Sequence, residues 1–324
     1  MSQADPQKKD SVNDKKITLK AVFLGLFVML LWGSLFPVIK LGYSVFLLEA
    51  SFYPTLFVFA GTRFIISGVF GLGYCAATKK ISLGKEPKNY LNVLFIALFA
   101  FVLHYGFLYV GLSSVSSSNT SLLNQAASIV FICFSFLFFK EEKFTVGKAI
   151  AVVSGVASIL IVNFDALKIN FDIGSLLILC AGLASVVSNI VSKKINSSVQ
   201  PVTYTCYAEF FGGIVLFAVG LLLGGQFGTV TPAGIGLFAY IIIATILSYT
   251  IWYYLVGKYD LSKLLIVKMA EPVFAVFIGA ILPLNTPIRW QHLVAIALVA
   301  TAILFGNVRF KREKHSLIKE GENI

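Results

Sequence analysis

Charged residues are scarce in this 324-residue chain, and few lie inside its apolar stretches. Only 13% of its residues are charged, against about 25% in a typical soluble domain, and 58% are hydrophobic. The sequence also lacks HExxH, GxSxG and Walker motifs, and has no Asp pair within an apolar stretch. These absences predict that the chain is not an enzyme and exclude an ATP-driven pump built from it alone.

Cysteine is also rare, with four residues in the chain, all inside apolar stretches: Cys75, Cys133, Cys180 and Cys206. No two have the spacing of metal ligands, so we interpret them as buried thiols rather than disulfides or a metal site. The sequence predicts no cofactor and no metal.

Long apolar runs occupy most of the chain. A hydrocarbon core of about 30 Å needs roughly 20 apolar residues to cross it as a helix. Runs of this length are too long for the 9–11-residue strands of a membrane barrel, so the sequence predicts transmembrane helices. Ten are expected, at about 21–43, 55–77, 90–112, 118–138, 146–162, 173–193, 203–224, 233–256, 262–283 and 288–307.

The connections between these runs predict the orientation. Ten crossings put both tails on one side, and 21 of the 26 Lys and Arg residues fall on that side. Two fall on the other, and three lie within or at the ends of segments. This asymmetry predicts an integral protein of the plasma (inner) membrane with both termini cytoplasmic.

Topology also accounts for the net charge of +11, with contact to anionic membrane lipids as a secondary effect. The short loops provide no soluble domain for nucleic acid, so we expect no nucleic-acid partner. The sequence leaves both a monomer and a dimer open.

A weak internal repeat divides the chain. An offset of 145 pairs Tyr109 with Tyr254 and Ser117 with Ser262. Five crossings per half is an odd number, so the second half must enter the membrane from the opposite side, as in inverted-repeat transporters. The expected organisation is an N-tail (1–20), a first five-helix repeat (21–162), an outside linker (163–172), a second five-helix repeat (173–307) and a C-tail (308–324).

Several stretches resemble the EamA-like family of the drug/metabolite transporter superfamily. They are WGSLFPVIK (32–40), the Arg63-Phe64 pair, SVSSSNTSLLNQAASIVF (114–131) with FFKEE (138–142), GKAIAVVSGVASILIV (147–162), EPVFAVFIGAIL (271–282) and QHLVAIALVATAILF (291–305). The resemblance implies an all-α membrane fold and export or exchange of small metabolites, amino acids or drugs by alternating access. This chain departs from the family pattern at Ala127 or Ser128, where a Pro is frequent, and at Pro283-Leu284-Asn285, where many members have Gly-Glu.

Polar side chains along the helices mark a candidate path. In the fourth segment, at about 118–138, Ser117, Ser121, Asn124 and Ser128 are spaced to share one helical face, which favours a cavity lining over plain hydrogen bonding between helices. Other polar groups lie in segment 173–193, which carries Ser185, Ser188, Asn189 and Ser192, and in segment 233–256, which carries Thr245, Ser248, Tyr249, Trp252 and Tyr253. The alternatives are an interfacial aromatic belt for Trp252 and Tyr253 and a packing role for His104. The residues predicted to bind substrate are Trp32, His104, Tyr105, Ser121, Asn124, Gln125, Ser128, Ser188, Asn189, Tyr249 and Trp252.

Ionisable side chains inside a membrane are costly, so each is a functional candidate. Lys268 and Glu271 are three residues apart in segment 262–283 and are expected to pair directly, either as a structural ion pair or as a gate beside Pro272. Arg63 and Glu209 occupy equivalent places in the two repeats. Lys40, near a helix end, is expected to be an interfacial anchor. The predicted gating or coupling residues are Arg63, Glu209, Lys268, Glu271 and Pro272.

We therefore expect a secondary transporter of small polar metabolites, an exporter or exchanger of amino acids or related compounds with a small-molecule substrate. The alternatives within this fold are a multidrug transporter and a carrier of nucleotide- or sugar-type metabolites. The alternatives of another class are a channel or scramblase and, with short loops against it, a membrane-embedded sensor.

Overall fold

A computed structural model describes residues 17–139, 142–162, 172–195, 199–282 and 290–307. Every regular element in these ranges is a helix. In chain order they are α1 (Leu19–Val45), α2 (Tyr53–Ala77), α3 (Pro87–Ile96), the π-helical η1 (Ala97–Leu103), α4 (His104–Ser114), α5 (Ser117–Phe138), α6 (Val146–Val162), α7 (Ile173–Lys193), α8 (Pro201–Leu222), α9 (Pro232–Lys258), α10 (Leu261–Lys268), α11 (Glu271–Ile281) and α12 (Trp290–Asn307). Most of the predicted tails and linker, and Pro283-Leu284-Asn285, lie outside the described residues.

Eight helical stretches among the described residues are long and apolar enough to cross a membrane. Two of them join several elements: α3, η1 and α4 form one stretch, and α10 and α11 another. The shorter apolar helices α6 and α12 complete the ten predicted crossings. The chain is an all-α polytopic membrane protein, as the sequence predicts.

Local sequence explains where several helices begin. Thr18, Ser116 and Thr231 precede α1, α5 and α9, and each side chain accepts a hydrogen bond from a backbone N–H in the first turn. Asp172 caps α7 in the same way through the Ser175 N–H at 2.8 Å, and this bond lowers the pKa of its exposed carboxyl. The capping side chains begin these helices at the membrane surface, where backbone N–H groups lack partners within the helix.

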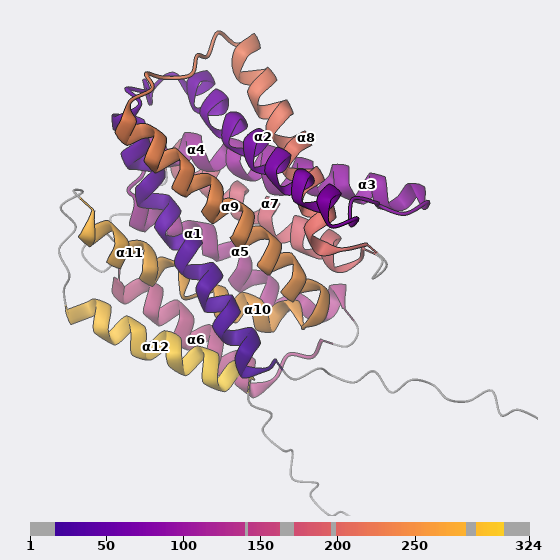
Figure 1. Ribbon diagram of the computed structural model, residues 1–324. Helices are drawn as coiled ribbons and strands as arrows, with labels where there is room; N and C mark the ends of the chain where they lie inside the picture. The colour runs from indigo at the N-terminus through magenta and orange to yellow at the C-terminus, as the bar shows by residue number, and fades with distance from the viewer. Residues whose placement is uncertain (1–16, 140–141, 163–171, 196–198, 283–289, 308–324) are drawn as a thin grey trace, which may run out of the picture.

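The packing of the helices follows the inverted repeat. The second helices of the two repeats, α2 and α8, lie side by side, as do the fifth helices, α6 and α12 (Figure 1). The first helix of each repeat packs against the third and fourth crossings of the other: α1 against α9 and α11, and α7 against α4 and α5. The two five-helix repeats therefore interlock, and the first, third and fourth crossings enclose the centre of the molecule.

Close contact between α2 and α8 depends on glycine. A Cβ added to Gly61 would lie 2.4 Å from the backbone nitrogen of Phe217, and one added to Gly213 would lie 2.7 Å from that of Ile65. These distances are shorter than any real contact, so neither position accepts a side chain at this separation. Small residues permit the close approach of membrane helices in this way.

Two crossings depart from the continuous α-helices that the sequence predicts. The third contains the π-helical turns of η1, a geometry that is common at functional sites. The ninth, predicted as one helix over 262–283, is broken at Met269-Ala270 into α10 and α11. Pro272 explains the break, because it lacks the N–H that a continuous helix would need there.

Candidate functional site

A cavity lies between the repeats, bounded by the first, third and fourth crossings. Its volume is about 30 Å³, room for the centres of one or two water molecules. A metabolite is larger, so its entry requires the lining side chains to move apart. The cavity is lined by Trp32, Leu35, Phe36, Ile39, Ala100, His104, Tyr105, Leu108, Asn124, Ser185, Ser188, Asn189, Tyr249, Trp252, Tyr253, Lys268 and Glu271.

Aromatic rings form one wall of the cavity. The ring of Trp32 lies 5.3 Å from that of Tyr249 and 5.1 Å from that of Trp252, between ring centroids. The Trp252 indole donates to the Asn189 side-chain oxygen at 2.7 Å, and the Tyr249 hydroxyl donates to that of Tyr105 at 2.9 Å. These bonds hold the rings in place and present their apolar faces to the cavity.

The break in the ninth crossing places two opposite charges at the cavity. Lys268 is the last residue of α10 and Glu271 the first of α11. A helix carries partial negative charge at its C-terminus and partial positive charge at its N-terminus, so each side chain lies at the helix end that stabilises its charge. The broken helix can therefore hold both charges deep in the membrane, where they are 3% and 2% exposed.

The expected direct ion pair between Lys268 and Glu271 is absent from the described structure, where the charged group of each contacts other side chains instead. The Lys268 ammonium lies 3.5 Å from the Ser185 hydroxyl and 5.7 Å from the ring centre of Trp32. The Glu271 carboxylate accepts a hydrogen bond from the Gln125 amide at 2.8 Å, and the side chain of Asn124 also faces it. Both charges thus keep capacity to bind a ligand.

Three other lining groups are available for recognition. The Trp32 indole N–H and the side-chain oxygen of Asn124 are buried and have no hydrogen-bond partner in the described part of the chain. His104 Nδ1 lies 2.7 Å from the Ala181 carbonyl oxygen, which can only accept, so Nδ1 is the donor. In the neutral ring this leaves Nε2 as an acceptor.

Eight of the eleven predicted substrate-binding residues line the cavity, and Lys268 and Glu271 from the gating set join them. Gln125 lies behind the lining and contacts Glu271. Ser121 and Ser128 are buried on α5 outside the lining, and Pro272 lies at the break beside it.

Arg63 and Glu209 are also absent from the lining, although both are completely buried. The Arg63 guanidinium lies over the rings of Phe64 and Tyr105, with its central carbon 4.2 and 4.7 Å from the ring centres. Glu209 accepts a hydrogen bond from Ser67 at 2.9 Å across the α2–α8 contact. The two residues belong to this helix contact, one layer behind the cavity.

Sequence reasoning did not assign seven lining residues to the site: Leu35, Phe36, Ile39, Ala100, Leu108, Ser185 and Tyr253. Ser185 and Tyr253 could have been predicted, since the sequence already shows both among the polar residues of their helices. The other five are apolar, and nothing in an apolar membrane segment separates a cavity-facing residue from a lipid-facing one.

A cavity enclosed by two interlocked, inverted five-helix repeats, with charges at a broken helix, defines the class of integral membrane transporters. The family model described as "EamA-like transporter family" matches residues 19–164 and again residues 172–308. The chain belongs to this family, as the motifs quoted above predict. Family and fold support a transporter rather than an enzyme.

Similar proteins span most of the chain. An uncharacterized transporter of Archaeoglobus fulgidus is 26% identical over 278 residues, which cover 84% of this chain and 93% of that protein. The uncharacterized transporters YoaV and YcxC of Bacillus subtilis are each 24% identical, over 90% and 77% of this chain and 99% and 85% of their own. A crystal structure titled only "Crystal structure of protein" shares the fold, with a TM-score of 0.74 at 16% identity over 92% of this chain and 99% of the other.

Proposed function

We propose that this chain is a secondary transporter of small zwitterionic metabolites, an exporter or exchanger of amino acids or related compounds. It works by alternating access around the central cavity, in the plasma (inner) membrane with both termini in the cytoplasm. The observation that carries the proposal is the pair of opposite charges at the break between α10 and α11, facing one aromatic cavity.

The lining matches a zwitterion group by group. Lys268 and the Trp32 N–H can donate to a carboxylate, and Glu271 and the Asn124 oxygen can accept from an ammonium. The rings of Trp32, Tyr249 and Trp252 offer an apolar surface for the rest of the molecule. A ligand with one charge would satisfy one of the two buried charges and leave the other without a counterion.

The small cavity supports a carrier rather than an open pore. With room for one or two waters, it cannot hold a metabolite until the surrounding helices rearrange. Interlocked inverted repeats supply two related packings, one open to each face, as alternating access requires.

A thermal-shift screen of the purified protein tests the substrate class. Amino acids are compared with their methyl esters, which lose the carboxylate charge, and with their N-acetyl forms, which lose the ammonium charge. We expect amino acids to raise the melting temperature in a saturable manner and both blocked forms to raise it less, because a ligand that binds the folded state stabilises it. Equal stabilisation by all three forms would contradict recognition of a zwitterion, and stabilisation by sugar or nucleotide compounds alone would favour another substrate class.

A further inference from the structure

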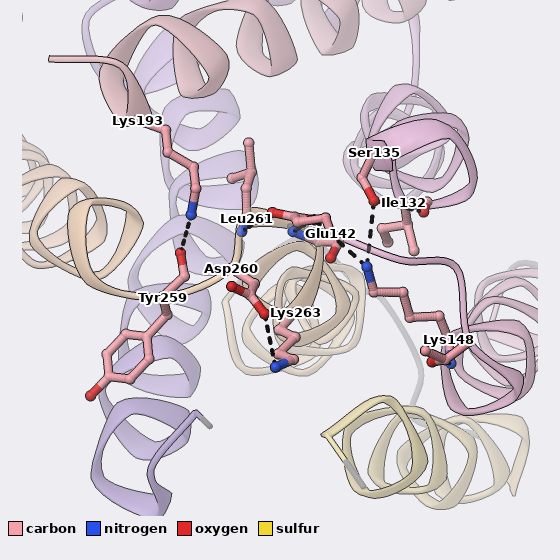
Figure 2. A network of polar contacts seen from close by, with 11 residues as sticks. Ile132, Ser135, Glu142, Lys148, Lys193, Tyr259, Asp260, Leu261 and Lys263 are labelled. Atoms are coloured by element: carbon pink, nitrogen blue, oxygen red, sulfur yellow. Dashed lines mark hydrogen bonds and ion pairs between the residues drawn. The ribbon is translucent and has the colours of Figure 1, made fainter. Parts of the chain in front are cut away.

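One membrane face carries a charged network that the proposed transport site does not use. We call it the tail face: α1 begins there at Leu19 and α12 ends there at Asn307. Helix direction puts the ends of α5, α7 and α9 and the starts of α6 and α10 on the same face. Figure 2 shows the network, which joins residues of both repeats.

The two repeats have equivalent lysine contacts, which lie at opposite faces because the repeats are inverted. In the first repeat the Lys40 ammonium of α1 donates to the Val115 carbonyl at 3.1 Å, and in the second the Lys193 ammonium of α7 donates to the Tyr259 carbonyl at 2.5 Å. Val115 and Tyr259 both cap the C-terminus of the third crossing in their repeat. These two contacts are local to each repeat, so neither ties one repeat to the other.

The tail face adds a contact that does join the repeats. Glu142, after α5, accepts hydrogen bonds from the backbone N–H groups of Leu261 and Ser262 at 2.9 and 3.3 Å (Figure 2). Lys148 of α6 lies 3.6 Å from the same carboxylate and bonds to the Ser135 hydroxyl at 3.4 Å. Glu142 and Lys148 are only 3% and 4% exposed. A first-repeat carboxylate thus caps a second-repeat helix.

The start of α10 depends on this contact from the other repeat. Its own N-cap residue, Asp260, makes no capping bond and instead pairs with Lys263 at 2.8 Å. The equivalent helix in the first repeat, α5, is capped by its own neighbour Ser116. The repeat offset of 145 places Pro287 opposite Glu142, and the sequence 282–289 contains no acidic residue. The sequence therefore provides an acidic cap of this kind at the tail face and not at the other.

α10 connects this contact to the cavity. It has eight residues, a length of about 12 Å at 1.5 Å per residue. Its first residue bonds to Glu142 and its last, Lys268, lines the cavity. A short helix held at both ends moves as one piece, so displacement of its start also displaces Lys268.

We propose that Glu142 is a latch that holds the cavity closed at the tail face, and that opening there requires its carboxylate to leave the N-terminus of α10. The inference rests on the proposed function, since it assigns a gate to that transport cavity. Charged partners suit this role. When closed, Glu142 is satisfied by two N–H groups and Lys148, and when open both charges regain water. Apolar side chains would instead become exposed to water on opening.

Cysteine accessibility tests the latch without any substrate. Ser188, which lines the cavity, is changed to Cys in a full-length background whose four native cysteines are replaced by Ser. A membrane-impermeant maleimide is applied from the tail face in vesicles of known orientation. We expect Glu142→Ala to raise the labelling rate by roughly tenfold or more, because hydrogen bonds to a charged group are lost, and Glu142→Gln to raise it less.

Asp260→Asn is the matched control, because it removes a carboxylate charge at the same helix end and leaves both hydrogen bonds of Glu142 in place. It should label at the parental rate. Unchanged labelling in both Glu142 variants, with melting temperatures near the parental value, would overturn the latch, as would equally fast labelling in Asp260→Asn. If Glu142→Ala does not fold, the labelling rate of Glu142→Gln alone tests the latch. Because no substrate is present, absence of transport activity would not affect this result.

Discussion

The fourth crossings of the two repeats occupy equivalent places but have different structures. α5 is one continuous helix of 22 residues, whereas its counterpart is broken into α10 and α11. The offset of 145 places Leu123 and Ala126 of α5 where the second repeat has Lys268 and Glu271, and Ala127 where it has Pro272. The fourth crossing of the first repeat thus contributes the neutral amide of Asn124 to the cavity lining, and that of the second contributes two charges.

The comparison shows how this chain keeps charge inside a membrane. A break frees backbone groups, which is tolerated in a membrane only beside a cavity or within protein. Here the freed helix ends also stabilise Lys268 and Glu271. The continuous α5 has no such ends, and its amides Asn124 and Gln125 instead face the Glu271 carboxylate. We therefore expect changes at the break to affect transport more than equivalent changes elsewhere.

Removing a charge at the break should have the largest effect. Truncating one member of a buried, hydrogen-bonded charge arrangement costs about 2–5 kcal/mol, so Lys268→Ala and Glu271→Gln should reduce flux in proteoliposomes to about 3% or less. Lys143→Ala, at an exposed loop position, is the control and should transport normally. Near-parental flux in both site variants, measured on folded protein, would remove the charges from the mechanism.

Making the broken helix resemble α5 should have the next largest effect. Pro272→Ala restores an N–H that can continue the helix through Met269-Ala270, which would reorient Lys268 and Glu271. We expect flux to fall about tenfold, because the two charges would no longer be held at separate helix ends facing the cavity. Parental flux in this variant would show that the break does not position the charges.

The reciprocal change tests the continuity of α5. Ala127→Pro should lower the melting temperature, because α5 would lose a helical hydrogen bond without the charges that occupy the break in the second repeat. A melting temperature equal to the parental value would show that α5 tolerates a break equally well, and the comparison between the two crossings would lose its basis.

Gly33, the position at which α1 contacts the break, should tolerate no side chain. A Cβ added to Gly33 would lie 2.7 Å from the Glu271 carbonyl oxygen, so Gly33→Ala should destabilise the protein by about 1–3 kcal/mol and reduce flux several-fold. Gly73, with nothing within 4 Å of such a Cβ, is the matched control, and Gly73→Ala should be neutral or slightly stabilising. Thermal unfolding measures both; equal melting temperatures would mean that α1 does not pack tightly at the break.

Loss of a single neutral donor should have the smallest effect. Trp32→Phe removes the unpartnered indole N–H but keeps an aromatic ring, so the KM for transport should rise about 3–10-fold with little change in maximal flux. Trp290→Phe, at a position 68% exposed, should leave both values unchanged. An unchanged KM for Trp32→Phe would exclude this N–H from substrate recognition.

Much of the fold could be predicted because the membrane imposes one dominant constraint. Crossing length, charge asymmetry and an odd number of segments per half suffice for ten helices in two inverted repeats. The polar positions on the helices also indicated much of the cavity lining, such as Asn124, Asn189 and Tyr249. Asn124 follows from helical spacing, and Asn189 and Tyr249 from the presence of polar side chains in apolar segments.

The remaining features depend on contacts between distant residues. Pro272 is compatible with either a bend or a complete break, and the sequence does not show that α1 packs against this place at Gly33. The π-helical turns of η1 leave no pattern in the sequence. Glu142 appeared only as part of a family motif, since its bond to α10 spans 119 residues of sequence.

Counterflow in proteoliposomes tests the central claim most directly. Vesicles loaded with an unlabelled amino acid identified by the thermal screen are diluted into the labelled form of the same compound. A carrier that binds a zwitterion at Lys268 and Glu271 predicts transient, saturable accumulation of label that Lys268→Ala abolishes. Label that enters without saturation, or equally fast in Lys268→Ala, would contradict it.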